Sequence, residues 1–439
     1  MKYLIPDYVY TAEGLQKQKA IAIDDDGRIT AIVDRESQAV VEDMLRGTYP
    51  LEELPDVVLI PGFVNAHSHI FQRALRGHTH RMLSSQDNFW TWRDAMYAEA
   101  QRLTPDSLYI LALDAYQEML AAGYTTVGEF HYVHHQLDGT PYTQPNEMSF
   151  AILHAGQDAG INVVLLMTAY AQGGFNQPVE VKQQRFCDAS VDAYLQRVDD
   201  LRRDGWAVGL APHSVRAVPE SWFRAIASYS QKNTLPLHVH ADEQRAEIEQ
   251  CQTAYGCTPI ELLERFGVLS PQTTIIHATH ASATELALLA KYGCTVCVCP
   301  TTEGDLGDGI APYVELMAED ILLAIGSDSN TRFDPIEELR WAEYTARMRY
   351  QRRGVLVCEN FSSSGPLLLD IGTHGGAIAL GQSTGTISVG MLADMLAIDL
   401  KQSAMRGWTE DDLLDTLFFG ASSNVIKQIW VQGRAISHT

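Results

Sequence analysis

Two histidines separated by one residue, His67 and His69, stand at the end of an apolar run that covers residues 57–66. Side chains on a β-strand alternate between its two faces, so both imidazoles point the same way. Two neutral imidazoles at the end of a strand supply half of a transition-metal site. The pair alone is weak evidence for a metal, and the other ligands must come from other strand ends.

Residues of the missing ligand types follow three later apolar runs: His240 and Glu243, then His277, then Asp328. Buried ionisable groups are costly unless they are paired or bind a metal. Four strand ends that all carry histidine or aspartate therefore indicate one shared site. Three histidines and one aspartate can hold a single Zn²⁺ and leave a position for water, and the set is His67, His69, His240 and Asp328.

The chemistry of such a site is hydrolysis. A bound metal lowers the pKa of its water to about 7 and gives hydroxide at neutral pH. Glu243 lies three residues after His240, where a carboxylate can take the proton of the water and deliver it to a leaving group. His277 and Asp328 are placed to orient the hydroxide. The run at 208–213 has no lysine to bridge two ions, which favours one metal, and the same ligands also suit Fe²⁺ or Mn²⁺.

A fold that gathers these residues must bring strand ends together. Apolar strand-like runs occur at 58–66, 124–131, 161–168, 207–213, 235–240, 273–279, 294–299 and 321–328. Helix-like segments alternate with them at 106–121, 148–159, 189–204, 220–232, 258–266, 282–292 and 334–350. Eight parallel βα units predict a TIM (β/α)₈ barrel, whose chemistry lies at the carboxyl ends of the strands. A doubly wound sheet is the alternative, and it is disfavoured because no Gly-X-Gly-X-X-Gly follows the first strand.

Composition limits the compartment and the partners. The chain has 439 residues and a formal net charge of −23, which argues against nucleic acid and anionic membranes as partners. No apolar stretch is long enough to span a membrane and the first residues do not form a signal peptide, so we expect a cytoplasmic protein. The seven cysteines indicate reduced thiols. We interpret Cys294, Cys297 and Cys299 as core residues of a buried strand.

Four segments resemble the amidohydrolase superfamily over essentially the whole chain: PGFVNAHSH at 61–69, HADE at 240–243, IHATH at 276–280 and GSDS at 326–329. The first and last parts of the chain are rich in short strand-like runs and turns. The resemblance implies that both termini build a small β-sandwich beside the barrel. We therefore predict sandwich parts at 1–60 and 385–439, and the barrel at 61–384.

Further segments, at 69–73, 89–93, 129–135, 213–218 and 303–309, are similar to the N-formimino-L-glutamate deiminases of histidine degradation. Those enzymes convert the formimino group to formyl and release ammonia. The resemblance implies a homodimer with one zinc ion per chain, and acid/base and orienting roles for Glu243 and His277. It also implies that five residues surround the substrate: Gln72, Arg93, Tyr132, His213 and Arg216.

The substrate of such an enzyme is a small dicarboxylate. Two carboxylates require bidentate partners, and Arg93 and Arg216 each lie in a loop near a strand end, so either could meet either carboxylate. The segment at 301–305, Thr-Thr-Glu-Gly-Asp, departs from the expected Ser-Thr-Glu-Ala-Asn type, which bears on fine substrate preference. The histidines at 131, 134 and 135 are interpreted as structural residues or as residues that support the site residues, and not as metal ligands.

Two other functions compete. A related aminohydrolase acting on a nucleobase would need amides and aromatic rings to stack and read a flat ring, instead of two arginines. A non-catalytic barrel used as a scaffold would have lost ligands, whereas all four ligands, Glu243 and His277 are present.

Overall fold

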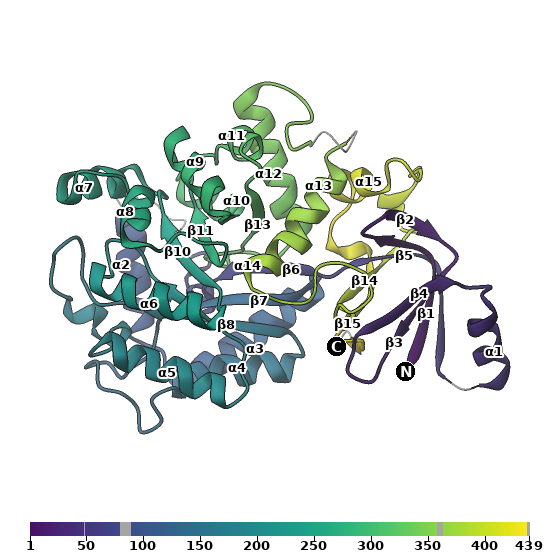
Figure 1. Cartoon of the computed structure of the whole chain (residues 1–439), viewed down its shortest axis with the longest axis horizontal. Helices are drawn as coiled ribbons and strands as arrows, with labels where there is room; N and C mark the ends of the chain where they lie inside the picture. The colour runs from purple at the N-terminus through teal and green to yellow at the C-terminus, as the bar shows by residue number, and fades with distance from the viewer. Residues whose placement is uncertain (48, 80–88, 358–362, 437–439) are drawn as a thin grey trace.

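The structure, a computed structural model, describes residues 1–47, 49–79, 89–357 and 363–436. Its centre is a parallel eight-stranded sheet in which each strand pairs with the next along the chain (Figure 1). The strands are β6 (Phe63–Ser68), β7 (Tyr124–His131), β8 (Asn162–Ala169), β9 (Val208–Pro212), β10 (Leu237–Ala241), β11 (Thr273–His277), β12 (Thr295–Val298) and β13 (Leu322–Ile325). The predicted barrel is confirmed.

The barrel closes between its first and last strands, at three of the predicted metal ligands. The backbone N–H of His69 donates to the carbonyl of Asp328 at 2.9 Å, and the N–H of Asp328 donates to the carbonyl of His67 at 3.0 Å. Ser68 pairs with Asp328 in a parallel bridge between these bonds. The seam of the barrel is therefore held by the backbone on either side of the site.

Helices cover the outside of the barrel (Figure 1). The larger ones are α2 (Phe89–Ala100), α3 (Pro105–Ala121), α4 (Glu147–Ala159), α5 (Val191–Arg203), α6 (Glu220–Asn233), α7 (Arg245–Tyr255), α8 (Pro259–Phe266), α9 (Ala283–Tyr292) and α12 (Pro335–Tyr350). The shorter ones are η1 (Ile70–Leu75), η2 (Val181–Phe186), α10 (Pro300–Leu306), α11 (Tyr313–Ala318), α13 (Gly365–Asp370), η3 (Ile371–Gly375) and α14 (Gly376–Ala379). The helix-like segments expected from the sequence are present with ends shifted by one or two residues.

Helix α9 illustrates how local sequence fixes these ends. The side chain of Ser282 accepts from the N–H of Glu285, and the carboxylate of Glu285 accepts from the N–H of Ser282 at 2.8 Å. This reciprocal capping starts the helix, and Gly293 ends it with a φ of 65°. The chain then enters β12 directly.

The expected first strand at 58–66 is wrong as a single element. Strand β5 (Leu51–Pro61) ends at Pro61 and belongs to a different sheet, and β6 begins at Phe63. Gly62 lies between them so close to β7 that a Cβ atom there would be 2.3 Å from Oγ1 of Thr125. The apolar run continues across the break because the last five residues of β5 and all of β6 are buried.

The second sheet joins the two ends of the chain, as expected, so that purple and yellow strands lie together in Figure 1. Its strands are β1 (Lys2–Thr11), β2 (Gly14–Lys17), β3 (Lys19–Ile23), β4 (Ile29–Asp34), β5, β14 (Met395–Asp399), β15 (Ile426–Val431) and β16 (Arg434–Ile436). Alternate residues of β1 enter opposite cores: Leu4 packs with Trp430, and Ile5 packs with Val40 of α1 (Gln38–Arg46). Helix α15 (Leu413–Gly420) and the turns η4 (Ser403–Met405) and η5 (Ser423–Val425) complete this end.

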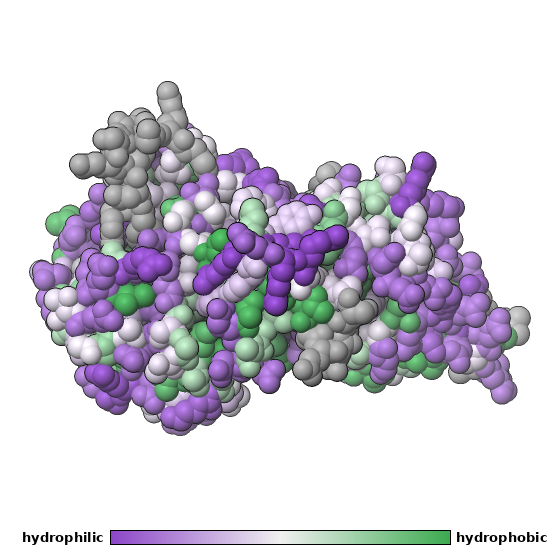
Figure 2. All heavy atoms as spheres, turned by 90° about the horizontal axis from the view of Figure 1, so that it is seen from above, coloured by the Kyte–Doolittle hydropathy of each residue, from purple (hydrophilic) through white to green (hydrophobic). Residues whose placement is uncertain are grey.

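The surface seen in Figure 2 is largely hydrophilic, with hydrophobic residues in small groups. Within the described ranges, each helix is too short or too polar to cross a bilayer. The domain limits at 60/61 and 384/385, the homodimer and the cytoplasmic location stay predictions.

Candidate active site

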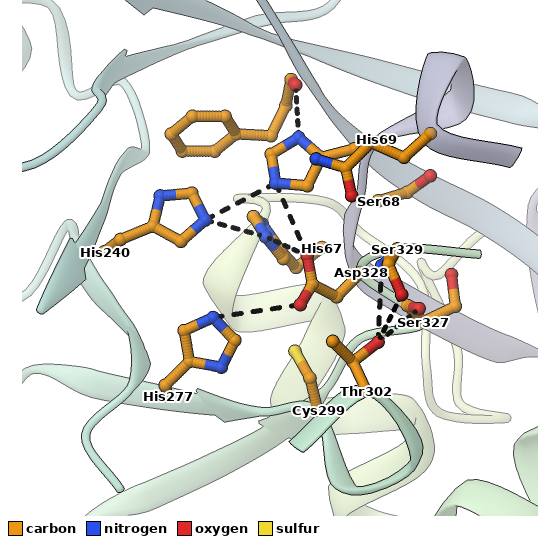
Figure 3. A network of polar contacts seen from close by, with 12 residues as sticks. His67, Ser68, His69, His240, His277, Cys299, Thr302, Ser327, Asp328 and Ser329 are labelled. Atoms are coloured by element: carbon orange, nitrogen blue, oxygen red, sulfur yellow. Dashed lines mark hydrogen bonds and ion pairs between the residues drawn. The ribbon is translucent and has the colours of Figure 1, made fainter. Parts of the chain in front are cut away.

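Four side chains converge at the carboxyl end of the barrel, as the sequence predicts (Figure 3). Oδ1 of Asp328 lies 3.3 Å from Nε2 of His67 and 3.4 Å from Nε2 of His69. Nε2 of His240 lies 3.1 Å from Nε2 of His67 and 3.4 Å from Nε2 of His69. All four side chains are buried, and one ligand atom of each lies within 4.8 Å of all the others.

These distances fit a tetrahedral metal. Zinc–nitrogen bonds of 2.0–2.1 Å place neighbouring ligand atoms about 3.3–3.4 Å apart. Four nitrogen and oxygen lone pairs at that spacing would repel one another, so a cation between them is the arrangement that the side chains suit. The donor set of three imidazoles and a carboxylate is one that zinc accepts.

Backbone carbonyls fix the orientation of two imidazoles. Nδ1 of His69 donates to the carbonyl of Phe130 at 2.9 Å, and Nδ1 of His240 donates to the carbonyl of His213 at 3.1 Å. In each ring the proton is on Nδ1, so the Nε2 lone pair faces the centre. Burial and neighbouring histidines lower the pKa of His67 and of His240 well below 6.5, which keeps the rings neutral.

The chain bends sharply where the site residues leave their strands. Asp242, His277 and Asp328 have φ values of 57°, 74° and 47°, in the left-handed region that non-glycine residues seldom adopt. Such backbone strain persists only where the surroundings enforce it, and it is concentrated at functional sites. Two of these three residues, His277 and Asp328, have side chains that line the site.

Glu243 and His277 stand beside the four ligand residues. Nε2 of His277 is 3.9 Å from Oε1 of Glu243 and 3.8 Å from Oδ2 of Asp328. Burial raises the pKa of Glu243 to about 7, although the nearby His277 lowers it. A carboxyl group with that pKa gains and loses a proton easily at neutral pH, which is the property of an acid/base catalyst.

Three carboxylates surround His277. Burial alone would lower its pKa, but Glu243, Glu303 and Asp328 together raise it well above 6.5. Nδ1 of His277 lies 3.4 Å from Oε1 of Glu303, which also accepts the backbone N–H of Cys299 at 2.9 Å. Glu303 is a residue whose contact with His277 the sequence reasoning missed, although the resemblance covered its segment.

The three cysteines interpreted as core are buried at the expected strand. Cys299 comes nearer to the site than expected, since its sulfur lies within 4.8 Å of a nitrogen of His277 and an oxygen of Asp328 (Figure 3). Burial and the neighbouring Cys297 raise the pKa of the Cys299 thiol well above 9.0. A protonated thiol is a poor metal ligand, so this second group is weaker than the first.

A cavity opens from these residues and encloses about 520 Å³, counting its mouth. Its wall contains Asp328, Glu243, His277, His69 and His240, and all five predicted substrate residues: Gln72, Arg93, Tyr132, His213 and Arg216. Nε2 of Gln72 donates to the hydroxyl of Tyr132 at 3.1 Å, and the ring of His213 stacks on that of His240 with centroids 5.0 Å apart. The predicted substrate residues and the metal-ligand group thus share one cavity.

The cavity wall also contains residues that sequence reasoning missed. Tyr97 of α2 and Tyr170, directly after β8, face it together with Met96 and Leu306. No local pattern distinguishes these aromatic residues from core residues. The only signal for Tyr170 was its position directly after a predicted strand. Many other residues share such a position, so the signal could not single it out.

The other histidine cluster lies outside this group. Nε2 of His135 lies 3.2 Å from Asp188, whose two oxygens each accept from Nη1 of Arg197 at 2.9 Å. Nε2 of His134 donates to the carbonyl of Thr168 at 2.8 Å. Among the described residues these histidines form no metal-ligand group, so the structural interpretation agrees with their contacts.

Comparisons with known proteins give the same picture. The amidohydrolase family matches residues 58–436. Formimidoylglutamate deiminase of Pseudomonas aeruginosa is 39% identical over 381 residues, which are 86% of this chain and 84% of that protein. A 5-methylthioadenosine/S-adenosylhomocysteine deaminase of Halothermothrix orenii is 27% identical, over 99% of this chain and 94% of that protein.

Solved structures extend the likeness to three dimensions. An amidohydrolase from Brucella melitensis has a TM-score of 0.89 at 32% identity, covering 99% of this chain and 94% of that one. Both relatives compared by sequence are named for removing nitrogen groups from their substrates. The chain belongs to the amidohydrolase family and is a metal-dependent hydrolase of carbon–nitrogen bonds.

Proposed function

We propose that the protein is a deiminase that uses one Zn²⁺ to hydrolyse N-formimino-L-glutamate to N-formyl-L-glutamate and ammonia. The observation that carries the proposal is the shared cavity, in which three of the four ligand residues, His69, His240 and Asp328, are accompanied by Arg93 and Arg216. A formimino carbon suits attack by activated water, and two guanidinium groups suit the two carboxylates of the substrate. The identity to the Pseudomonas aeruginosa enzyme supports the same substrate.

In this proposal His67, His69, His240 and Asp328 hold the ion, which when bound would activate a water molecule for attack. Glu243 accepts a proton at its carboxylate as water adds to the formimino carbon, and returns it to the nitrogen that leaves as ammonia. His277 orients the reacting oxygen, because its Nε2 lies between the carboxylates of Glu243 and Asp328.

Gln72 suits recognition of the formimino group. Its amide nitrogen donates to Tyr132, while its buried Oε1 has no hydrogen-bond partner among the described residues. A buried acceptor without a partner is costly, and the N–H groups of a formimino substrate would satisfy it. His213 closes the same side of the cavity by stacking on His240.

A purine or nucleobase deaminase is the competing function, because the Halothermothrix orenii relative spans nearly the whole chain. The two arginines in the cavity weigh against a neutral flat ring, because such a ring has no carboxylate for a guanidinium group to bind. Ammonia release should therefore be compared for N-formimino-L-glutamate, adenosine, guanine and cytosine with zinc-loaded protein. Release from a base and none from formiminoglutamate would refute the proposal.

A substitution tests the role of Glu243. Glu243→Gln should keep its metal and lose about 10²–10⁴-fold in kcat, since the amide cannot carry the proton. Metal content by atomic emission and single-substrate kinetics measure the two effects. Unchanged kcat would remove Glu243 from proton transfer, and loss of metal would show a structural role instead.

A further inference from the structure

Two tyrosine hydroxyls and one amide form a closed triangle in the wall of the cavity. Nε2 of Gln183 donates to the hydroxyl of Tyr97 at 3.1 Å and to the hydroxyl of Tyr170 at 3.0 Å. The two hydroxyl oxygens are 3.3 Å apart. Gln183, in η2, is fully buried, and Phe186 of the same turn packs against both tyrosine rings.

The orientation of the amide is fixed independently of the tyrosines. The backbone N–H of Glu180 donates to Oε1 of Gln183 at 2.9 Å. The oxygen of the amide therefore points to Glu180 and its nitrogen points to the phenols. An amide nitrogen carries two hydrogens, so each tyrosine oxygen receives one of them.

The triangle has one O–H hydrogen more than its own hydrogen bonds can use. Each phenol still has its own O–H hydrogen, and the contact between the two oxygens can use only one of the two. Tyr97 and Tyr170 have no further hydrogen-bond partner within the described part of the chain. Both residues line the cavity, so the remaining hydrogen is available to a ligand there. Burial raises the pKa of Tyr170 well above 10.0, which keeps it a donor.

The surroundings select an anionic ligand group. Arg93 and Arg216 line the same cavity, and the guanidinium of Arg93 lies over the ring of Tyr97 at 5.6 Å. A neutral O–H beside guanidinium groups is a typical partner of a carboxylate, and hydrogen bonds to charged groups are stronger than neutral ones.

The position of the triangle selects which carboxylate. The ring of His213 stacks on the ligand residue His240, and the ring of Tyr170 contacts His213 at 5.1 Å between centroids. The tyrosine pair is therefore one ring farther from the metal ligands than His213. The α-carboxylate of the substrate is attached next to the formimino nitrogen, whereas the side-chain carboxylate is two methylene groups farther away.

We propose that Tyr97 and Tyr170, held by Gln183, recognise the side-chain carboxylate of the substrate and determine specificity for it. This inference rests on the proposed function. Tyr97 and Tyr170 are specificity residues that touch substrate, and Gln183 is a positioning residue that aims their hydrogens into the cavity.

The test compares three substrates in wild-type protein and in the double variant Tyr97→Phe/Tyr170→Phe, because either phenol alone could supply the donor. N-formimino-4-aminobutanoate keeps the side-chain carboxylate and lacks the α-carboxylate. N-formimino-2-aminobutanoate keeps the α-carboxylate and lacks the other. The double variant should lose about tenfold or more in kcat/KM for formiminoglutamate and for the 4-aminobutanoate derivative, mainly through KM. It should change less than about twofold for the 2-aminobutanoate derivative.

Equal losses on all three substrates would overturn the inference, and so would a loss confined to the 2-aminobutanoate derivative. Tyr124→Phe is the matched control, since Tyr124 is also buried, at the opposite end of β7, and its hydroxyl has no partner among the described residues. A second variant, Gln183→Glu, keeps the shape and offers acceptors to both phenols. It should give the same substrate pattern if the double variant does not fold, and a uniform loss would refute the positioning role.

The inference and the proposed function can fail separately. If wild-type protein hydrolyses formiminoglutamate and the double variant does so equally well, the inference alone fails. If wild-type protein releases no ammonia from it, the proposed function fails, and calorimetry with glutarate then tests the carboxylate site directly. Weaker glutarate binding by the double variant would support that site, and unchanged affinity would overturn it.

Discussion

The barrel contains two buried histidine clusters that differ in what their aspartate does. In the first, Asp328 faces nitrogens of His67, His69 and His277, and no arginine among the described residues forms an ion pair with it. In the second, Asp188 accepts from both Arg197 and His135. Burial lowers the pKa of His67, His69 and His240 in the first cluster. In the second it lowers the pKa of His134, and that of His131 to about 3. Neutral imidazoles alone are therefore not enough for a metal site. The site also needs a carboxylate that is not already paired with an arginine.

The largest expected effect separates the two clusters by metal content. Asp328→Asn should lose its metal and at least about 10³-fold in activity, since even residues that only support ligands contribute about 10–100-fold. Asp188→Asn should keep its metal. Atomic emission and ammonia release on both purified variants measure the difference, and a metal-free Asp188→Asn protein would contradict the comparison.

The second prediction concerns stability. Asp188→Asn removes the charge that balances a buried guanidinium, which should lower the free energy of unfolding by about 3 kcal/mol. Urea unfolding followed by circular dichroism measures it. Asp204→Asn, at an exposed position after α5, is the control and should change stability by less than about 0.5 kcal/mol. Equal effects at both positions would show that the buried pair contributes nothing special.

The smallest effect concerns a third carboxyl group, Glu129, which lies under the metal-ligand cluster. It accepts the hydroxyl of Ser68 at 2.8 Å and the N–H of Ile70 at 2.7 Å, on either side of His69. Burial raises its pKa from 4.5 to about 8, so the folded chain keeps a proton that the unfolded chain releases. Stability from this group is fully present below pH 4.5 and declines as the pH rises toward 8.

Glu129→Gln should remove this decline. The urea midpoint of metal-free protein is measured between pH 5 and pH 8, and its slope against pH is compared between the variant and the wild type. The second cluster has the opposite sense: Arg197 and His135 lower the pKa of Asp188 despite its burial, so its contribution is lost as the pH falls through that lowered pKa. Parallel slopes for wild type and Glu129→Gln would show that the carboxyl group is ionised in the folded protein.

The convergence of the four proposed ligand residues could be predicted from sequence because each is fixed by its place at a strand end. His67 and His69 share a face through strand alternation, and Asp328 ends the last strand of a barrel whose order is set by the chain. Strand alternation decides which way each side chain points, and the strand order of the barrel brings the strand ends together.

Gln183, Tyr97 and Tyr170 could not be predicted in this way. Gln183 lies in a short turn between β8 and α5, and Tyr97 lies in a helix before β7. Their contact depends on how two connections fold over the barrel mouth, which packing decides and periodicity does not encode. The break at Gly62 was missed for a related reason, since burial on both faces hides the change of sheet.

An ion bound at the seam between β6 and β13 would also stabilise the closure of the barrel. The two strands that meet there are separated by most of the barrel sequence, and Ser68 and Asp328 pair across it. An ion held by His67, His69 and Asp328 would cross-link these distant parts of the chain. Closing so long a loop costs conformational entropy, which metal binding would offset. The ion can therefore bind its full set of ligands only after the last barrel strand has been synthesised. Removing the ion should weaken the contact between β6 and β13 before other strand contacts of the barrel.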